Sequence, residues 1–286
     1  MLCTLCALLD CTACRSLSPA LLPGRAACGW LHNKAHCARV TCAAVLYEVR
    51  RLRRLSTSGS AEDGDEGSSE GETMVLFVNA CIRGERSRTL ELCREFLTGL
   101  KQRGACIREV NLEQAHLLPL GEQKVAFRSQ LTRAKLYDDD IFDFAHQIAE
   151  ADEVVIGAPY WDLSFPAALK TYIEHVSVEG ITFHYTDEGV CEGLCRAKRI
   201  VYITTSGGFV SSELDENGDP KPGCNLGYDY VRAIAKMFGI PETRCVSAEG
   251  LEIVGVNIND QMDKARTRIE ELLAEEPEDA EGCAAE

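Results

Sequence analysis

Residues 74–104 read MVLFVNACIRGERSRTLELCREFLTGLKQRG, and this stretch decides the fold class. The run MVLFVN (74–79) is short, continuous and apolar, as in a parallel strand that is buried on both faces. A polar loop follows, and residues 89–104 then carry apolar side chains at helical spacing. The stretch therefore predicts a strand followed by a helix.

The same alternation continues to the end of the chain. Further strands are predicted at CIREVNL (106–112), EVVIGAP (153–159), RIVYITTSGG (199–208) and TRCVSAEGL (243–251). Helices are predicted at 141–151, 166–176, 230–239 and 262–276, with Pro166 opening the second of these and Gly239 ending the third. Five strands with intervening helices predict an α/β fold with a doubly wound parallel sheet.

Two segments exceed this plan, at 120–140 and at 180–196. The second contains GITFHYTDEGVCEGL (180–194), with β-type residues around an Asp-Glu-Gly turn, and predicts a small hairpin before the fourth strand. Insertions of this kind commonly shape the site of an enzyme built on such a sheet.

The ends of the chain differ in composition from its middle. Residues 1–55 form a Cys-rich extension without a helical or strand period, and residues 56–73 form an acidic Gly/Ser linker with six acids and no base. The domain predicted to bind a ligand covers 74–275, and 276–286 is predicted to be a disordered acidic tail.

Four cysteines of the extension, Cys3, Cys6, Cys11 and Cys14, form a CxxC-x4-CxxC pattern. Two such knuckles around one zinc are usually a dozen or more residues apart, so no metal site is predicted. The simpler interpretation is that the extension precedes the true start of the protein, which would then be Met74.

The net charge of −15 argues against a nucleic acid or an anionic membrane as partner, because a phosphate-tracking surface needs clustered Lys and Arg. No stretch reaches the roughly 18 consecutive apolar residues of a membrane helix. An acidic protein of the cytoplasm is the plain interpretation.

Ligands of open parallel sheets bind beyond the carboxyl ends of the strands, so the loops after strands one, three and four are the candidate site. In the first loop, Gly84 relaxes the chain, while Ser87 and Thr89 bring hydroxyls to the start of a helix near several arginines. This pattern suits a phosphate monoester. Capping of the helix by Ser87, with solvated arginines, is the alternative.

The other two loops suit a flat ring system. Residues 158–170 read APYWDLSFPAALK, with aromatic side chains at Tyr160, Trp161 and Phe165, and residues 204–209 read TTSGGF, in which paired glycines allow close backbone approach. Neither GxxxxGK[ST] nor GxGxxG is present, which disfavours an ATPase or a dinucleotide fold and leaves a mononucleotide.

In these three loops the sequence resembles the family of FMN-dependent NADH:quinone oxidoreductases and azoreductases, over roughly Met74 to Glu275. The resemblance implies a flavodoxin-like sheet of strand order 2-1-3-4-5 and FMN as cofactor. The positions that match its FMN-binding motifs are Cys81, Ser87, Arg88, Thr89, Tyr160, Trp161, Asp162, Leu163, Thr205, Ser206, Gly207 and Gly208. Cys81 replaces a serine of the family and Asp162 replaces an asparagine.

The family's G-V-T-F-x-Y segment matches residues 180–185, which implies a homodimer in which Tyr185 lines the substrate pocket of the neighbouring subunit. Phe165 is a second substrate-side candidate. The implied reaction is ping-pong hydride transfer from NADH or NADPH through the flavin to a quinone or azo compound. The flavin performs this chemistry, so no catalytic side chain is assigned.

Two alternatives remain open. A flavodoxin-type electron carrier would use the acidic surface to dock to a basic redox partner, although it would not need the two insertions. A flavin-free binding protein is the other, because a fold does not determine its function. Bound flavin, and turnover without an added protein partner, separate the three hypotheses.

Overall fold

The computed structural model describes residues 73–211 and 213–275. The predicted extension at 1–55, the linker at 56–73 apart from its last residue, and the tail at 276–286 lie outside the described residues. Their boundaries stay predictions.

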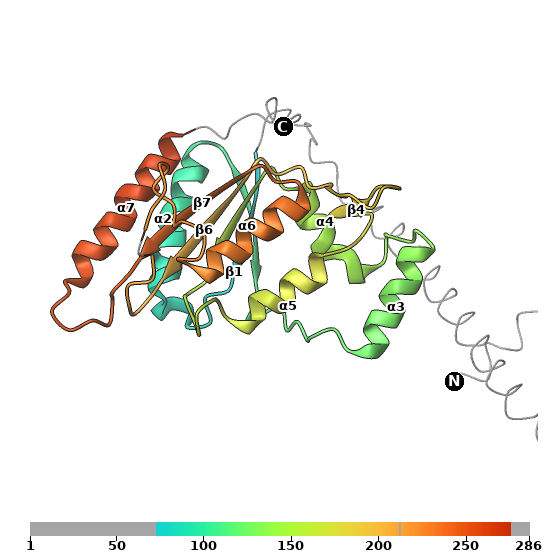
Figure 1. The fold of residues 1–286 in the computed structure, drawn as a ribbon, viewed down its shortest axis with the longest axis horizontal. Helices are drawn as coiled ribbons and strands as arrows, with labels where there is room; N and C mark the ends of the chain where they lie inside the picture. The colour runs from blue at the N-terminus through green and yellow to red at the C-terminus, as the bar shows by residue number, and fades with distance from the viewer. Residues whose placement is uncertain (1–72, 212, 276–286) are drawn as a thin grey trace, which may run out of the picture. The chain divides into compact units, whose positions relative to one another are not determined.

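The centre of the fold is a five-stranded parallel sheet (Figure 1). Its strands are β1 (Met74–Asn79), β2 (Cys106–Asn111), β3 (Glu153–Gly157), β6 (Arg199–Thr205) and β7 (Glu242–Ala248). They lie in the order β2-β1-β3-β6-β7, and every neighbouring pair is parallel. The predicted order 2-1-3-4-5 is therefore confirmed.

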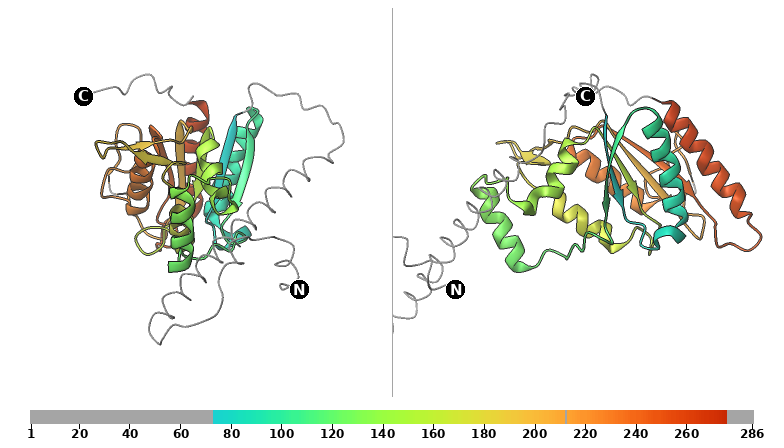
Figure 2. Two further views of the ribbon diagram at one scale, coloured as in Figure 1. Left: turned by 90° about the vertical axis from the view of Figure 1, so that its right-hand side faces the viewer. Right: turned by 180° about the vertical axis from the view of Figure 1, so that it is seen from behind.

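Helices cover both faces of the sheet, as the two views of Figure 2 show. On one face lie α2 (Arg88–Gln102) and α7 (Ile258–Ala274), which pack against each other. On the other lie α4 (Asp143–Glu150), α5 (Ala167–Val176) and α6 (Leu226–Phe238). This arrangement explains the continuous apolar runs of β1, β3 and β6, because helices cover these strands on both faces.

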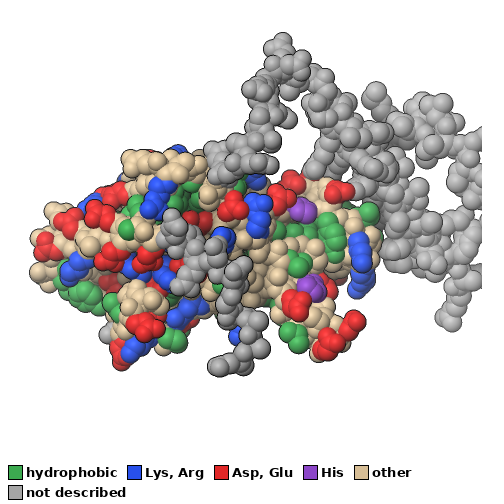
Figure 3. Space-filling model, turned by 90° about the horizontal axis from the view of Figure 1, so that it is seen from above, with side chains coloured by type: hydrophobic (Ala, Val, Ile, Leu, Met, Phe, Trp, Pro, Cys, Tyr) green, Lys and Arg blue, Asp and Glu red, His purple; other side chains and the backbone are tan. Residues whose placement is uncertain are grey.

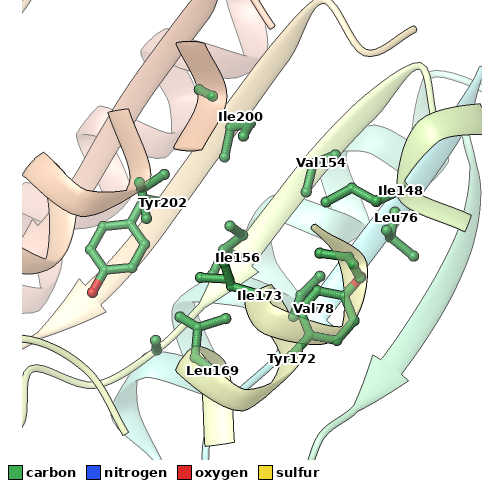
Figure 4. Close-up of a cluster of buried hydrophobic side chains, with 14 of the residues drawn as sticks. Leu76, Val78, Ile148, Val154, Ile156, Leu169, Tyr172, Ile173, Ile200 and Tyr202 are labelled. Carbon is green, nitrogen blue, oxygen red and sulfur yellow. The ribbon is translucent and has the colours of Figure 1, made fainter. Parts of the chain in front are cut away.

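Successive side chains of β1 enter different cores, as the two-residue period of a strand requires. Val75 and Phe77 pack with α2 and α7, whereas Leu76 and Val78 pack with α4 and α5. Figure 4 shows the second core, in which Leu76 and Val78 lie near Tyr172 of α5. The sheet is thereby fixed between two layers.

Two helix ends agree with the sequence, and one differs by a residue. The side chain of Ser87 accepts a hydrogen bond from Leu90 N (3.3 Å) and caps α2. Gly239 ends α6 in the left-handed conformation, with φ of 78°. Pro166 is the N-cap of α5 rather than its first helical residue, a difference within the usual uncertainty of helix ends.

The insertion at 120–140 contains a helix that the sequence did not predict, α3 (Glu122–Arg133), followed by the 3-10 turn η3 (Asp140–Phe142). Val125 and Phe127 of α3 are exposed, and of the side chains of α3 only Leu131 is buried. Arg128 joins α3 to the end of α5, because its guanidinium donates to the carbonyls of Glu174 and Ser177 at 2.7 Å each.

The predicted hairpin is present as β4 (Phe183–Tyr185) and β5 (Cys191–Gly193), which pair antiparallel before β6. A second excursion, residues 206–225, separates β6 from α6. None of the helices in the described part of the chain is long and apolar enough to cross a membrane. On the face shown in Figure 3, acidic and basic side chains are interspersed.

Candidate functional site

A cleft of about 540 Å³ opens at the carboxyl edge of the sheet. Its lining residues are Arg83, Arg86, Ser87, Arg88, Thr89, Pro159, Tyr160, Trp161, Asp162, Thr205, Ser206, Gly207, Leu251 and Glu252. Parallel strands end on one edge, which is why the loops after β1, β3, β6 and β7 meet there.

The first wall is the turn between β1 and α2. Gly84 has φ of 54° and opens the 3-10 turn η2 (Gly84–Arg86), after which Ser87 begins α2. This path places the side chains of Arg83, Arg86 and Arg88 at the cleft. Together with the unpaired N–H groups of the first turn of α2, they make this wall attractive to an anion.

The two hydroxyls of this wall are already bonded to protein groups. Ser87 caps α2, while Thr89 Oγ1 lies 2.7 Å from Thr205 Oγ1 on β6. The capping alternative for Ser87 is therefore what the structure shows, although the residue also lines the cleft. In its capping bond the Ser87 hydroxyl accepts, so its own proton can still be donated to a ligand, together with the arginine side chains and backbone N–H groups on this side.

Cys81 does not line the cleft. Its thiol lies beneath the turn, 3.6 Å from the carbonyl of Gly157, and only 6% of the residue is exposed. A hydrogen bond with Cys93 is the main cause that lowers the pKa of Cys81, against the opposing effect of burial. Cys81 thus supports the loop from below.

The second wall is the loop after β3. Trp161 and Ser164 exchange two backbone hydrogen bonds (3.1 and 2.8 Å) around Asp162 and Leu163, which have φ of 48° and 67°. Consecutive positive φ values are typical of a type I′ turn, in which leucine is strained. The tight turn holds Trp161 and Asp162 at the cleft, and Tyr160 N bonds Thr205 O (2.9 Å).

The third wall joins two loops. Residues 205–207 line it from β6, and Leu251 and Glu252 line it from the loop after β7. Sequence reasoning missed the second loop because only strands one, three and four were considered. The signal that could have found it is the adjacency of the fourth and fifth strands in the predicted order.

Several predicted site residues lie outside the cleft lining: Cys81, Leu163, Phe165, Tyr185 and Gly208. Phe165 packs edge-on against Tyr230 at 5.5 Å between ring centroids. Tyr185 lies on β4, is 56% exposed and packs edge-on against Phe183. In the described residues no three His, Cys, Asp or Glu side chains come together to hold a metal ion.

The cleft fits a mononucleotide with a flat ring. Its cationic wall suits a phosphate, its aromatic wall suits a ring, and its volume lies within the range of about 300 to 1,000 Å³ that is usual for small-molecule sites. Sheet order and cleft together define a flavodoxin-like α/β protein with a site for one nucleotide.

Comparison with known proteins agrees with this class. The family model described as "Flavodoxin-like fold" matches residues 73–273. The FMN-dependent NADH:quinone oxidoreductase of Clostridium perfringens (strain SM101) is 34% identical over 197 residues, covering 66% of this chain and 91% of that protein. The protein of the same name from Caldicellulosiruptor bescii is 36% identical over 203 residues, covering 69% and 96%. The chain belongs to the flavodoxin-like family of FMN-dependent NADH:quinone oxidoreductases.

A solved structure supports the same assignment. The azoreductase from Bacillus anthracis strain Sterne superposes with a TM-score of 0.60 at 26% identity, covering 70% of this chain and 98% of that chain. The resemblance stated from sequence is thereby confirmed over 91% to 98% of the length of these relatives.

Proposed function

We propose that this protein binds FMN in the cleft and uses it to transfer reducing equivalents from NADH or NADPH to a quinone or an azo compound. The observation that carries the proposal is the convergence of a cationic turn, an aromatic turn and a glycine-containing wall on one cleft. The names of the relatives, with FMN, NADH, quinone and azo reduction among them, support the same activity.

Bound flavin would supply the capacity to accept a hydride and pass it on. The residues of the chain have the tasks of binding and orientation. Arg83, Arg86, Arg88 and the start of α2 would hold the phosphate, and Tyr160 and Trp161 would contact the ring. Asp162 and Glu252 place two carboxylates at the same cleft, which disfavours a second anionic group beside the ring.

We further propose that the protein is a homodimer. Tyr185 is exposed on the β4–β5 hairpin and does not line the cleft of its own chain. Val190 of the same hairpin is also exposed. A neighbouring copy would give both side chains an apolar partner and would bring Tyr185 to its cleft. A cytoplasmic location stays the prediction made from composition.

The decisive experiment is to purify the chain, measure its absorbance near the flavin bands, and identify any nucleotide released on denaturation. Bound FMN, with NADH oxidation by menadione in the absence of another protein, is the expected result. A colourless protein that cannot be reconstituted with FMN contradicts the proposal. A yellow protein that needs a second protein for turnover indicates an electron carrier instead. Light scattering gives the number of subunits.

A further inference from the structure

We propose that Glu249 is a positioning residue for the segment 206–209 after β6, of which Ser206 and Gly207 line the cleft. The inference rests on the proposed function and adds a residue that neither the sequence motifs nor the cleft lining identifies. Glu249 directly follows β7, and its carboxylate turns back to the segment after β6.

The carboxylate of Glu249 accepts hydrogen bonds from two sides. Its Oε2 atom accepts from Val210 N (2.7 Å) and Ser211 N (2.9 Å), and its Oε1 atom accepts from Ser211 Oγ (2.5 Å) and Ser247 Oγ (3.2 Å). An ionised carboxylate can only accept, and here both oxygens receive donors. Residues 210–211 are thereby fastened to the end of β7.

The backbone of residues 206–208, just before Val210 and Ser211, is oriented by hydrogen bonds from the loop after β7. The carbonyls of residues 206–208 accept from N–H groups of residues 250–252, in the pairs Gly250 N to Gly208 O (3.0 Å), Leu251 N to Ser206 O (3.1 Å) and Glu252 N to Gly207 O (3.0 Å). In a planar trans peptide the C=O and N–H point in opposite directions. The N–H groups of residues 207–209 therefore point away from residues 250–252.

Of these three N–H groups, that of Gly207 belongs to a residue that lines the cleft, and those of Gly208 and Phe209 follow it in the chain. Within residues 73–211 and 213–275, none of the three donates a hydrogen bond to another group. A row of fixed backbone donors stabilises a ligand atom that gains negative charge during reaction. The ring of FMN gains electrons when it is reduced, so the row suits this ligand in particular.

The hydrogen bonds of Glu249 are needed because the segment after β6 contains two adjacent glycines, whose backbone is easily rearranged. Gly207 and Gly208 are the most flexible residues a backbone can contain. Beyond them the chain leaves the sheet for an excursion that returns only at α6. Three of these four hydrogen bonds join Glu249 to Val210 and Ser211 and so preserve the orientation of the peptides before them, while the fourth, from Ser247, holds the carboxylate to β7. The pKa of Tyr160 is raised mainly by burial and, to a smaller extent, by the negative charge of the Glu249 carboxylate.

The test is the Glu249→Gln variant, whose amide nitrogen is a donor and faces backbone and hydroxyl donors. Glu216→Gln is the matched control, because Glu216 is an exposed acid of the same excursion. We expect the dissociation constant of FMN to rise about tenfold in Glu249→Gln, which corresponds to about 1.4 kcal/mol, and to change less than about twofold in the control. Reduced flavin should lose more affinity than oxidised flavin, which moves the midpoint potential to a more negative value.

An unchanged dissociation constant and an unchanged potential in folded Glu249→Gln would overturn the proposal. Equal effects in Glu216→Gln would also overturn it, since charge alone would then be the cause. If circular dichroism shows that Glu249→Gln does not fold, Ser211→Ala removes one donor and leaves the carboxylate in place. We expect about threefold weaker FMN binding in that variant, and no effect there contradicts the inference.

The two proposals fail differently. A wild-type chain that binds no FMN refutes the proposed function. Amide hydrogen exchange of Val210 and Ser211 in the flavin-free protein still reports on the fastening, and it should accelerate in Glu249→Gln but not in Glu216→Gln. Equal exchange in the two variants would show that Glu249 does not hold this segment.

Discussion

The hydroxyls of Thr89 and Thr205 lie 2.7 Å apart and join the first turn of α2 to the last residue of β6. This bond connects the phosphate-side wall of the cleft to the ring-side wall, across 116 residues of sequence. Replacing either threonine by valine leaves the other hydroxyl without its partner at a site where Thr89 is fully buried.

We expect Thr89→Val and Thr205→Val each to lower the free energy of unfolding by about 1 to 2 kcal/mol. The double variant should lose about as much as one single variant, so the coupling energy should equal one single loss, about 1 to 2 kcal/mol. Urea unfolding of the four proteins measures this cycle. Strictly additive losses would show that the two hydroxyls act independently.

The arginines of the β1–α2 turn should make the cleft bind FMN more tightly than riboflavin, which lacks the phosphate. Arg86→Gln should reduce FMN affinity by about three- to tenfold at low salt and leave riboflavin affinity unchanged. Lys101→Gln, at the far end of α2, is the control. The measurement is quenching of flavin fluorescence at two salt concentrations. An equal loss for both ligands would place Arg86 away from the phosphate.

The strained turn after β3 predicts a stabilising substitution. Leu163 has φ of 67° and is 66% exposed, so its side chain contributes little burial while its backbone is strained. Asparagine tolerates this conformation, and Leu163→Asn should raise the free energy of unfolding by about 1 kcal/mol. Leu163→Ala keeps the strain and should gain nothing. Thermal unfolding of the flavin-free proteins checks both, and a loss in Leu163→Asn would contradict the strain.

Gly157 at the end of β3 is closely packed, so a larger residue at this position should disturb the core. A Cβ at this position would lie 2.5 Å from Cys93 Sγ and 3.2 Å from the ring of Phe77. Gly157→Ala should therefore destabilise by about 1 to 3 kcal/mol, and adding Cys93→Ala should recover part of the loss. Gly121→Ala, where no atom lies within 4 Å, is the matched control. Chemical denaturation supplies the values, and no recovery in the double variant would mean that another contact is responsible.

His175 predicts a pH dependence of stability. Its Nε2–H donates to Leu118 O (2.9 Å), and burial is the main cause that lowers its pKa. Between that lowered pKa and about 6.5, the unfolded chain binds more protons than the folded one, so stability falls as the pH falls through this window. His175→Gln should flatten the decline in unfolding free energy measured from pH 7.5 to 5. Parallel curves for the two proteins would contradict this assignment.

The sheet was predictable because each strand is a continuous apolar run bounded by polar loops, from MVLFVN at 74–79 onward. The hairpin followed from β-type residues on both sides of an Asp-Glu-Gly turn. Helix α3 was not predicted, because it buries only Leu131 and therefore has almost no apolar period. The excursion at 206–225 was missed for the same reason, since polar contacts rather than an apolar pattern hold it.

The sequence predicted which loops form the site better than it predicted which side chains line it. Nine of the twelve positions matched to FMN motifs line the cleft, because the loops after β1, β3 and β6 must meet at one edge. Cys81 points beneath the turn, where its neighbours on α2 and β3 decide its orientation. Glu252 reaches the cleft only through the pairing of β7 with β6. Contacts of this kind depend on tertiary structure, which no local pattern encodes.

The insertion around α3 is joined to the rest mainly through Arg128 and a small cluster that includes Leu131 and Phe142. Its helix also carries trypsin-sensitive side chains such as Lys124 and Arg133. A cut there would sever no pairing of the sheet, since β2 and β3 both hydrogen-bond to β1. The nicked chain is therefore expected to stay together as two associated fragments, and this segment is a place where the chain tolerates insertion or exchange.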